Sequence, residues 1–222
     1  MKILYFSLLL SIMWWMQCFG QTSDYSKISP EDKKKWDVVE KLLNSTERLL
    51  LLLAKNGSER LLSTKCWTSQ RKEVVDRGFR HVIRYRNKSN VITEPSATNA
   101  ALARKTATFE VNYYLGLSKG NASISVTHSR TFAENAIPGV TGVYRISHVN
   151  ETEECFVIVS NGLLGSQGCA LWIKKKNRRK DHPDCIDAFN STCGWSEAPV
   201  YHYNETICPP ATIKPKKKNC SF

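Results

Sequence analysis

The segment ECFVIVSNGLLGSQGCALWI, at residues 154–173, contains two predicted β-strands, and each of them begins with a cysteine. Apolar residues follow Cys155 and Cys169, and a glycine-containing segment separates the two runs, which is typical of an antiparallel hairpin. No charge stands directly after either cysteine, because Phe156 and Ala170 occupy those positions. The hairpin therefore predicts an uncharged, buried wall, and it is the segment from which fold and ligand are inferred.

Six further strands are predicted ahead of this hairpin. Between residues 79 and 86, apolar residues alternate with arginines, so one face of that strand is dry and the other is wet. In the strand at 141–148, we expect Tyr144, Ile146 and His148 to share one face. The complete set of predicted strands is 49–55, 65–71, 79–86, 107–113, 121–128, 141–148, 155–160 and 169–174.

Two helices flank the predicted strands. Ser29 can cap a helix in which Pro30 takes the first turn and acids follow, and apolar residues recur at helical spacing as far as Leu43. A second helix is predicted to begin at 181–184 and to end at 193–194, before an extended segment at 200–203. Together these elements predict an all-β fold, an eight-stranded antiparallel barrel that can hold one small ligand. A two-sheet sandwich is the alternative.

The predicted inner face of the barrel is aromatic and aliphatic. Such residues can fill a core, or they can surround an apolar cavity with a few polar groups. His81 is more typical of a hydrogen-bonded core histidine, and Glu110 is expected to point outwards because Phe109 and Val111 take the other face. The residues expected inside are Phe79, His81, Ile83, Tyr85, Phe109, Val111, Tyr113, Tyr144, Ile146, Phe156, Ile158 and Trp172.

The start of the chain predicts secretion. Lys2 precedes an apolar run to Met16, and the small residues Cys18 and Gly20 suit cleavage of a signal peptide. No later run is long enough to span a bilayer. Eight asparagines head Asn-x-Ser/Thr triplets and are predicted to carry glycans: Asn44, Asn56, Asn87, Asn121, Asn150, Asn190, Asn204 and Asn219.

The other cysteines and the charge agree with an extracellular protein. Seven cysteines follow residue 20, and their spacing predicts disulfides rather than a zinc site, with Cys220 left over. The formal net charge is +12, and the basic runs at 174–180 and 214–218 could attract anionic glycans or simply favour solubility. No Gly-x-Ser-x-Gly motif or phosphate loop occurs, so no catalytic residue, cofactor or metal is expected. Neither nucleic acid nor a membrane anchor is expected.

These residues resemble the tick salivary lipocalins of the histamine-binding-protein family. The resemblance rests on a helix carrying Trp36-Asp37, a cysteine in the second strand, and the pattern Cys-x-Val…Cys-x-Leu-Trp followed by three further cysteines. It implies a signal peptide at 1–20, a disulfide-stapled lipocalin barrel domain at 21–208 and a basic C-terminal tail at 209–222. It also implies that Cys66 pairs with Cys208 and Cys155 with Cys185, leaving Cys169 with Cys193.

The resemblance bears on the ligand as well. Family members that bind histamine or serotonin carry an acid just after the first hairpin cysteine and a glutamate before Leu-Tyr or Leu-Trp in the second strand. Phe156 and Ala170 stand there instead. A buried ammonium requires a carboxylate, so a lipid or eicosanoid is favoured. The expected ligand-binding residues are Trp36, Asp37, His81, Tyr85, Phe109, Tyr113, Tyr144, Phe156 and Trp172.

Other charged residues keep alternatives open. Asp37, Glu110 or Glu134 could hold an amine at a different place, and Arg104 or Arg145 could meet a carboxylate head group. The resemblance implies a secreted monomer that sequesters a small host inflammatory or haemostatic mediator and so blunts host defence. The alternative is an inhibitor that binds a host protease, complement component or receptor through its loops and basic tail.

Overall fold

The computed structural model describes residues 28–56, 64–87, 106–129, 140–161, 167–194 and 200–208. The elements, in chain order, are α2 (Pro30–Leu43), β1 (Leu49–Asn56), β2 (Thr64–Val75), β3 (Gly78–Asn87), β4 (Thr106–Ser118), β5 (Asn121–His128), β6 (Gly142–Asn150), β7 (Cys155–Asn161), β8 (Gln167–Lys174), the short 3₁₀ helix η3 (Lys175–Asn177), α5 (Pro183–Cys193) and β9 (Val200–His202). None of the helices within these ranges is long and apolar enough to cross a bilayer.

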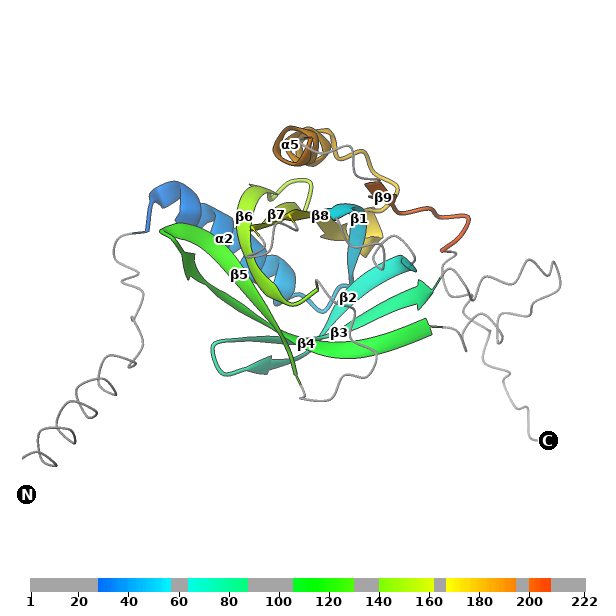
Figure 1. Ribbon diagram of the computed structural model, residues 1–222, viewed down its shortest axis with the longest axis horizontal. Helices are drawn as coiled ribbons and strands as arrows, with labels where there is room; N and C mark the ends of the chain where they lie inside the picture. The colour runs from blue at the N-terminus through cyan, green and yellow to red at the C-terminus, as the bar shows by residue number, and fades with distance from the viewer. Residues whose placement is uncertain are drawn as a thin grey trace, which may run out of the picture.

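Eight antiparallel strands close into a barrel, which confirms the predicted architecture over the sandwich (Figure 1). Each strand from β2 to β8 pairs with the next along the chain, β8 pairs with β1, and β1 returns to β2. The closing contact is short, because only Leu49 and Leu50 of β1 pair with Ser69 and Thr68 of β2. Further along, the same strand pairs with β9 through residues 53–55.

The hairpin β7–β8 is buried on both faces, which explains its lack of charge. Phe156 and Ile158 belong to the core cluster inside the barrel, which α2 extends with Val38, Val39, Leu42 and Leu43. Val157, Val159 and Leu171 belong to a second cluster outside the barrel, where α5 contributes Phe189. Figure 1 shows α5 lying outside the barrel wall. A strand covered on both sides has no wet face on which a charge could be solvated.

One predicted face assignment is wrong. Tyr144 and Ile146 face the interior as expected, but His148 lies outside and its Nε2 is 2.8 Å from Asp184 Oδ2. The pairing of β6 with β7 shifts register between Ile146 and His148. A β-bulge there inserts an extra residue, so the alternation reverses beyond it, and Val149 packs against the interior instead.

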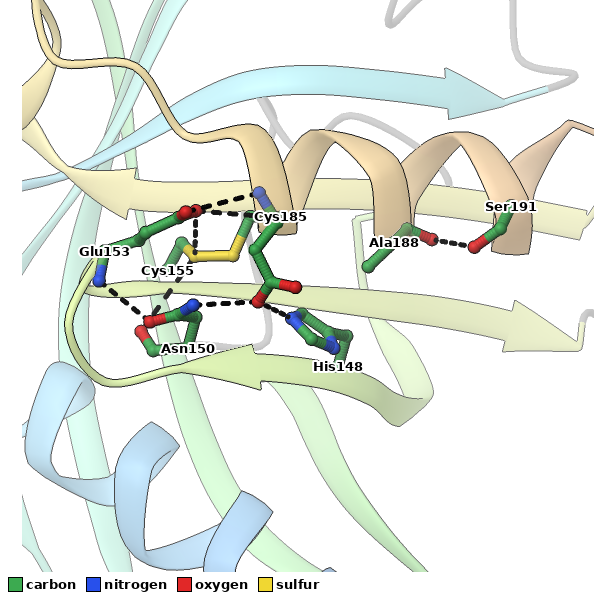
Figure 2. Close-up of polar contacts among 8 residues, drawn as sticks. His148, Asn150, Glu153, Cys155, Cys185, Ala188 and Ser191 are labelled. Atoms are coloured by element: carbon green, nitrogen blue, oxygen red, sulfur yellow. Dashed lines mark hydrogen bonds and ion pairs between the residues drawn. A yellow bond between two sulfur atoms is a disulfide. The ribbon is translucent and has the colours of Figure 1, made fainter.

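Figure 2 shows how the start of α5 is held. No side chain of the N-cap residue His182 caps the helix. The carboxylate of Glu153, in the β6–β7 turn, instead accepts hydrogen bonds of 3.2 Å from the backbone N–H groups of Asp184 and Cys185. A carboxylate at a helix N-terminus satisfies these donors and suits the dipole.

Three disulfides tie strands to the C-terminal part of the chain, and their pairs are those that the resemblance implied. They join Cys66 to Cys208, Cys155 to Cys185 and Cys169 to Cys193. Each such bridge is typically worth about 2–4 kcal/mol. Glu153 lies close enough to Cys155 and Cys185 to suggest a metal site, but the two sulfurs are bonded to each other and are not thiolate ligands.

We expect Glu154 to be a stabilising charge beside the hairpin. Burial disfavours its ionised form, but hydrogen bonds from Lys174, Asn177 and Lys176 outweigh this and lower its pKa to about 2. Because the folded pKa is depressed, the stabilisation is complete above the unfolded pKa near 4.5 and is lost as the pH falls towards 2. Glu154→Gln should therefore lower the free energy of unfolding at pH 7 by roughly 2–3 kcal/mol.

Urea denaturation at pH 7 and pH 3 tests this expectation. Glu151 provides the matched control, because its ion pair with Lys41 is exposed on both sides. Glu151→Gln should leave the unfolding free energy nearly unchanged, because water screens an exposed ion pair. Equal effects of the two substitutions would contradict a special role for Glu154.

Candidate functional site

An apolar cavity of about 80 Å³ lies inside the barrel. This volume exceeds what a single water needs, so the interior is not packed solid. None of the lining residues among those that the structure describes carries a carboxylate or a basic group. The lining is formed by Leu49, Leu51, Ala54, Trp67, Tyr113, Val126, Val140, Tyr144, Phe156, Ile158, Gly168, Cys169, Ala170 and Trp172.

The two positions that matter most for an amine ligand both lie in this wall. Phe156 is a neighbour of Trp172 across the β7–β8 ladder, and Ala170 is a neighbour of Ile158. All four residues line the cavity. An acid at either position would therefore sit in the cavity wall, where Phe156 and Ala170 instead leave it without a counter-charge for an ammonium group.

A buried hydrogen-bond chain runs behind the cavity wall. His81 Nε2 is 3.0 Å from the carbonyl oxygen of Leu43, and His81 Nδ1 is 2.8 Å from Ser69 Oγ. Ser69 Oγ is in turn 3.4 Å from the hydroxyl of Tyr113, whose ring packs edge-on against His81. The chain links α2, β3, β2 and β4, so it also ties the helix to the barrel.

The direction of this chain follows from its first member. A carbonyl oxygen can only accept, so Nε2 of His81 must carry the proton. Burial lowers the pKa of His81 to about 4, so the ring is neutral near pH 7 and Nδ1 is an acceptor. The Ser69 hydroxyl then donates to Nδ1 and accepts from Tyr113. The proton of Tyr113 is thereby committed, and its oxygen can offer only lone pairs to a ligand.

Two other polar hydrogens of the wall are also engaged. Trp67 Nε1 donates to Thr64 Oγ1 at 2.8 Å, and the Tyr144 hydroxyl donates to the carbonyl of Val140 at 3.0 Å. Among the lining side chains, the indole N–H of Trp172 is the one donor that has no partner within the described residues. A ligand inside this wall would therefore find more acceptors than donors.

The structure divides the predicted ligand-binding residues into four groups. Trp172, Phe156, Tyr144 and Tyr113 line the cavity, while His81 lies behind the wall. Tyr85 and Phe109 pack around Trp67, with ring centroids 4.8 and 6.3 Å from it. Neither of them lines the cavity. Trp36 and Asp37 belong to α2 and do not line it either.

The predicted alternative head-group partners lie away from the cavity. Asp37 is exposed and borders a surface groove together with three lysines, Lys33, Lys34 and Lys41. Glu110 points outwards as expected and forms an ion pair with Lys72. Arg145 is exposed on β6. Glu134 and Arg104 lie outside the described residues.

Trp67 is the main lining residue that sequence reasoning missed. It follows Cys66, which has a positive φ of 61°, and the β2–β3 pairing shifts register between Lys65 and Thr68. These irregularities break the period-two alternation on which an inward assignment depends. The size and aromatic character of Trp67 were the only signals available in the sequence.

The glycosylation triplets are distributed over the surface. Asn44, Asn190 and Asn204 are exposed, and Asn121 and Asn150 are half-buried. The side chain of Asn150 also bonds Asp184 and the backbone of Glu153. The side chains of Asn56 and Asn87 lie outside the described part of the chain, as do Asn219 and Cys220.

The buried histidine predicts a pH-dependent stability. Its folded pKa of about 4 lies below the ordinary value of 6.5, so the unfolded chain binds the proton first as the pH falls. The stabilisation is complete above pH 6.5 and should decline between pH 6.5 and 4 by on the order of 3 kcal/mol. His81→Gln should remove this component of the decline, measured by denaturant unfolding at several pH values.

The control for this measurement is His202→Gln, because His202 is exposed on β9. Its pH profile should coincide with that of the unmodified protein. If the pH profile of His81→Gln also coincides with that of the unmodified protein, His81 is not buried as a neutral ring.

Comparisons with known proteins agree with this geometry. The family model described as "Tick histamine binding protein" matches residues 27–209. Japanin from Rhipicephalus appendiculatus, solved with bound cholesterol, is 15% identical with a TM-score of 0.50, covering 73% of this chain and 95% of that one. Lobster apocrustacyanin A1 is 10% identical with a TM-score of 0.41, covering 79% of this chain and 86% of that one. A bovine odorant binding protein variant is 7% identical with a TM-score of 0.40, covering 72% of this chain and 93% of that one. No curated protein sequence matches.

The family model covers most of the chain, and the closed barrel with its flanking helices is the lipocalin fold. The chain therefore belongs to the tick histamine binding protein family.

Proposed function

We propose that this protein binds and sequesters one small, predominantly apolar molecule that carries a hydroxyl or another neutral hydrogen-bond donor. The observation that carries this proposal is the composition of the cavity wall. Its described residues include no carboxylate and no basic group, and the proton of the Tyr113 hydroxyl is committed to Ser69. A ligand that reaches the Tyr113 oxygen must donate to it.

The same wall disfavours a biogenic amine. Transfer of an ammonium from water into an apolar cavity is costly unless a carboxylate compensates it. The aromatic rings of Trp67, Phe156 and Trp172 could supply cation–π attraction, which is typically worth about 0.5–2 kcal/mol and does not replace a counter-charge. We therefore expect histamine and serotonin to bind weakly, although the family is named for histamine.

A carboxylate-bearing lipid is disfavoured for a related reason. A buried carboxylate needs several donors or a cation, and the lining offers only the indole of Trp172 as a donor without a described partner. An eicosanoid or fatty acid would have to keep its head group at the mouth of the barrel, in water. A sterol or fatty alcohol has no such charge, so these neutral lipids are the preferred class.

The biological setting follows from the family and from the sequence. The predicted signal peptide, the three disulfides and the glycosylation triplets suit a secreted, glycosylated monomer. Stoichiometric binding without chemistry would remove a host inflammatory or haemostatic mediator from solution. An apolar cavity inside the barrel suits such removal.

Native mass spectrometry of the secreted protein tests the ligand class. Matched pairs that differ only in the head group are the most informative probes, for example hexadecanol and hexadecanoic acid, together with cholesterol, histamine and serotonin. We expect one-to-one complexes with the neutral lipids and weaker binding of the acid. Tight one-to-one binding of histamine would refute the proposal.

The wall can also be altered to accept an amine. Ala170→Glu places a carboxylate in the cavity wall, so histamine or serotonin affinity should rise by about tenfold or more, the effect of one favourable charge-assisted contact. Ala170→Gln is the matched control, with similar size and no charge, and should show no gain. Isothermal titration calorimetry at pH 7.5 measures both. A gain shared by the two variants would indicate that charge is not the deciding factor.

A further inference from the structure

Two glutamates form ion pairs with four of the six basic residues in the run at 174–180. Lys174 and Lys176 form ion pairs with Glu154 at 2.6 and 3.2 Å. Arg178 and Arg179 form ion pairs with Glu205 at 2.9 and 3.2 Å. Lys175 and Lys180 have no acidic partner within the described residues. Lys180 is exposed, whereas Lys175 is half-buried, so the two unpaired lysines have different environments.

Lys175 faces a pocket of about 140 Å³ on the outside of the barrel. The pocket lies at the place where β1 and β2 pair through only two residues, so the strands do not fill the surface between them. Four cationic side chains line it, and no acidic residue is among its described lining. The full lining is Arg48, Cys66, Thr68, Arg84, Arg86, Thr106, Lys175, Tyr203 and Cys208.

Neutral groups hold the arginines in place. Gln70 Oε1 accepts from Arg48 Nε at 3.0 Å and from Arg84 Nη1 at 3.1 Å. Arg86 Nη1 donates to the carbonyl of Ile207 at 3.2 Å. Each guanidinium has five N–H donors, so these contacts orient the groups without consuming them. The Cys66–Cys208 disulfide forms part of the lining and restrains its base.

The cations destabilise one another in the absence of an anion. Burial, together with the charges of Arg48, Arg178, Arg86 and Arg84, lowers the pKa of Lys175. Burial and the charge of Arg48 lower the pKa of Arg84 as well. Like charges held together at the cost of mutual repulsion are what an anion-binding site requires, because a bound anion converts the repulsion into attraction.

We propose that this pocket binds a sulfate or phosphate group, held by Arg48, Arg84, Arg86 and Lys175. Arginine forks match the oxygens of such a group, and Thr68, Thr106 and Tyr203 add neutral hydroxyls to the lining. The group could belong to a sulfated oligosaccharide or to a free inorganic anion. This site is separate from the barrel cavity and does not depend on its ligand.

Isothermal titration calorimetry on the full secreted chain at low ionic strength tests the site. The probes are inorganic sulfate, inorganic phosphate and a fully sulfated disaccharide. Tighter binding of the disaccharide, with displacement by inorganic sulfate, would identify a sulfated glycan as the source. Equal affinities would identify the anion group alone. Absence of binding by all three probes would overturn the proposal.

Four variants separate the pocket from the general charge of the protein. Arg84→Gln and Lys175→Gln should each weaken binding by about tenfold, the loss expected for one charge-assisted hydrogen bond. Two control substitutions remove equal charge outside the pocket: Lys180→Gln, in the same basic run, and Arg145→Gln, at an exposed position of β6. Each should change the affinity less than about twofold.

Thermal unfolding of each variant tests whether it is folded. If Arg84→Gln is unstable, the independent Lys175→Gln substitution still tests the pocket. Equal weakening by all four substitutions would show that the attraction is diffuse and would overturn the pocket.

Discussion

Burial of the β7–β8 hairpin on both faces is the constraint on which the rest of the structure depends. Its inner residues line the cavity, and its outer residues pack against α5. Two disulfides, Cys155–Cys185 and Cys169–Cys193, fasten the same helix to the same two strands. Because neither face meets water, every side chain between the cysteines and the strand ends must be uncharged or compensated. The ligand chemistry of the cavity and the attachment of the helix therefore have a common physical origin.

Charge is separated accordingly. The chain has a formal net charge of +12, yet the residues described in the cavity lining carry no formal charge. Glu153, Glu154 and Glu205 neutralise cations and helix dipoles at the outer surface, where water also reduces the energetic cost. Four cations without an acidic residue in their described lining, Arg48, Arg84, Arg86 and Lys175, lie beside the short β1–β2 closure. The neutral ligand proposed for the barrel interior and the anion proposed for the outer pocket both rest on this separation of charge.

The chain from Leu43 through His81 and Ser69 to Tyr113 gives the cavity a fixed polarity. Its direction is set by a backbone carbonyl of α2, which can only accept. A change in the position of that helix would therefore alter both the packing of the barrel and the hydrogen-bonding character of its wall. The structure places His81 as a buried, hydrogen-bonded core histidine. Its contacts nevertheless determine whether the Tyr113 hydroxyl donates or accepts a hydrogen bond toward a ligand.

Local patterns in the sequence were sufficient to predict most of the helices and strands. The helix at 30–43, the eight strands, the closed barrel and the outward position of Glu110 were all predicted, because periodicity and capping depend on neighbouring residues. The pattern of cysteines, through the family resemblance, also indicated the three bridges. The absence of acids after Cys155 and Cys169 was visible in the sequence, and the positions of Phe156 and Ala170 in the cavity wall follow from simple alternation.

Only the tertiary structure decided which residues the bulges redirect and which charges meet. Five consecutive leucines at 49–53 show no alternation, and a register shift between Leu51 and Leu53 determines that Leu51 and Ala54 face the cavity. Similar irregularities turn Trp67 inwards and His148 outwards. Arg48, Arg84 and Lys175 are far apart in sequence, and they converge because the barrel closes between β1 and β2. Bulges and strand closure arise from contacts between distant segments, so no local pattern in the chain encodes them.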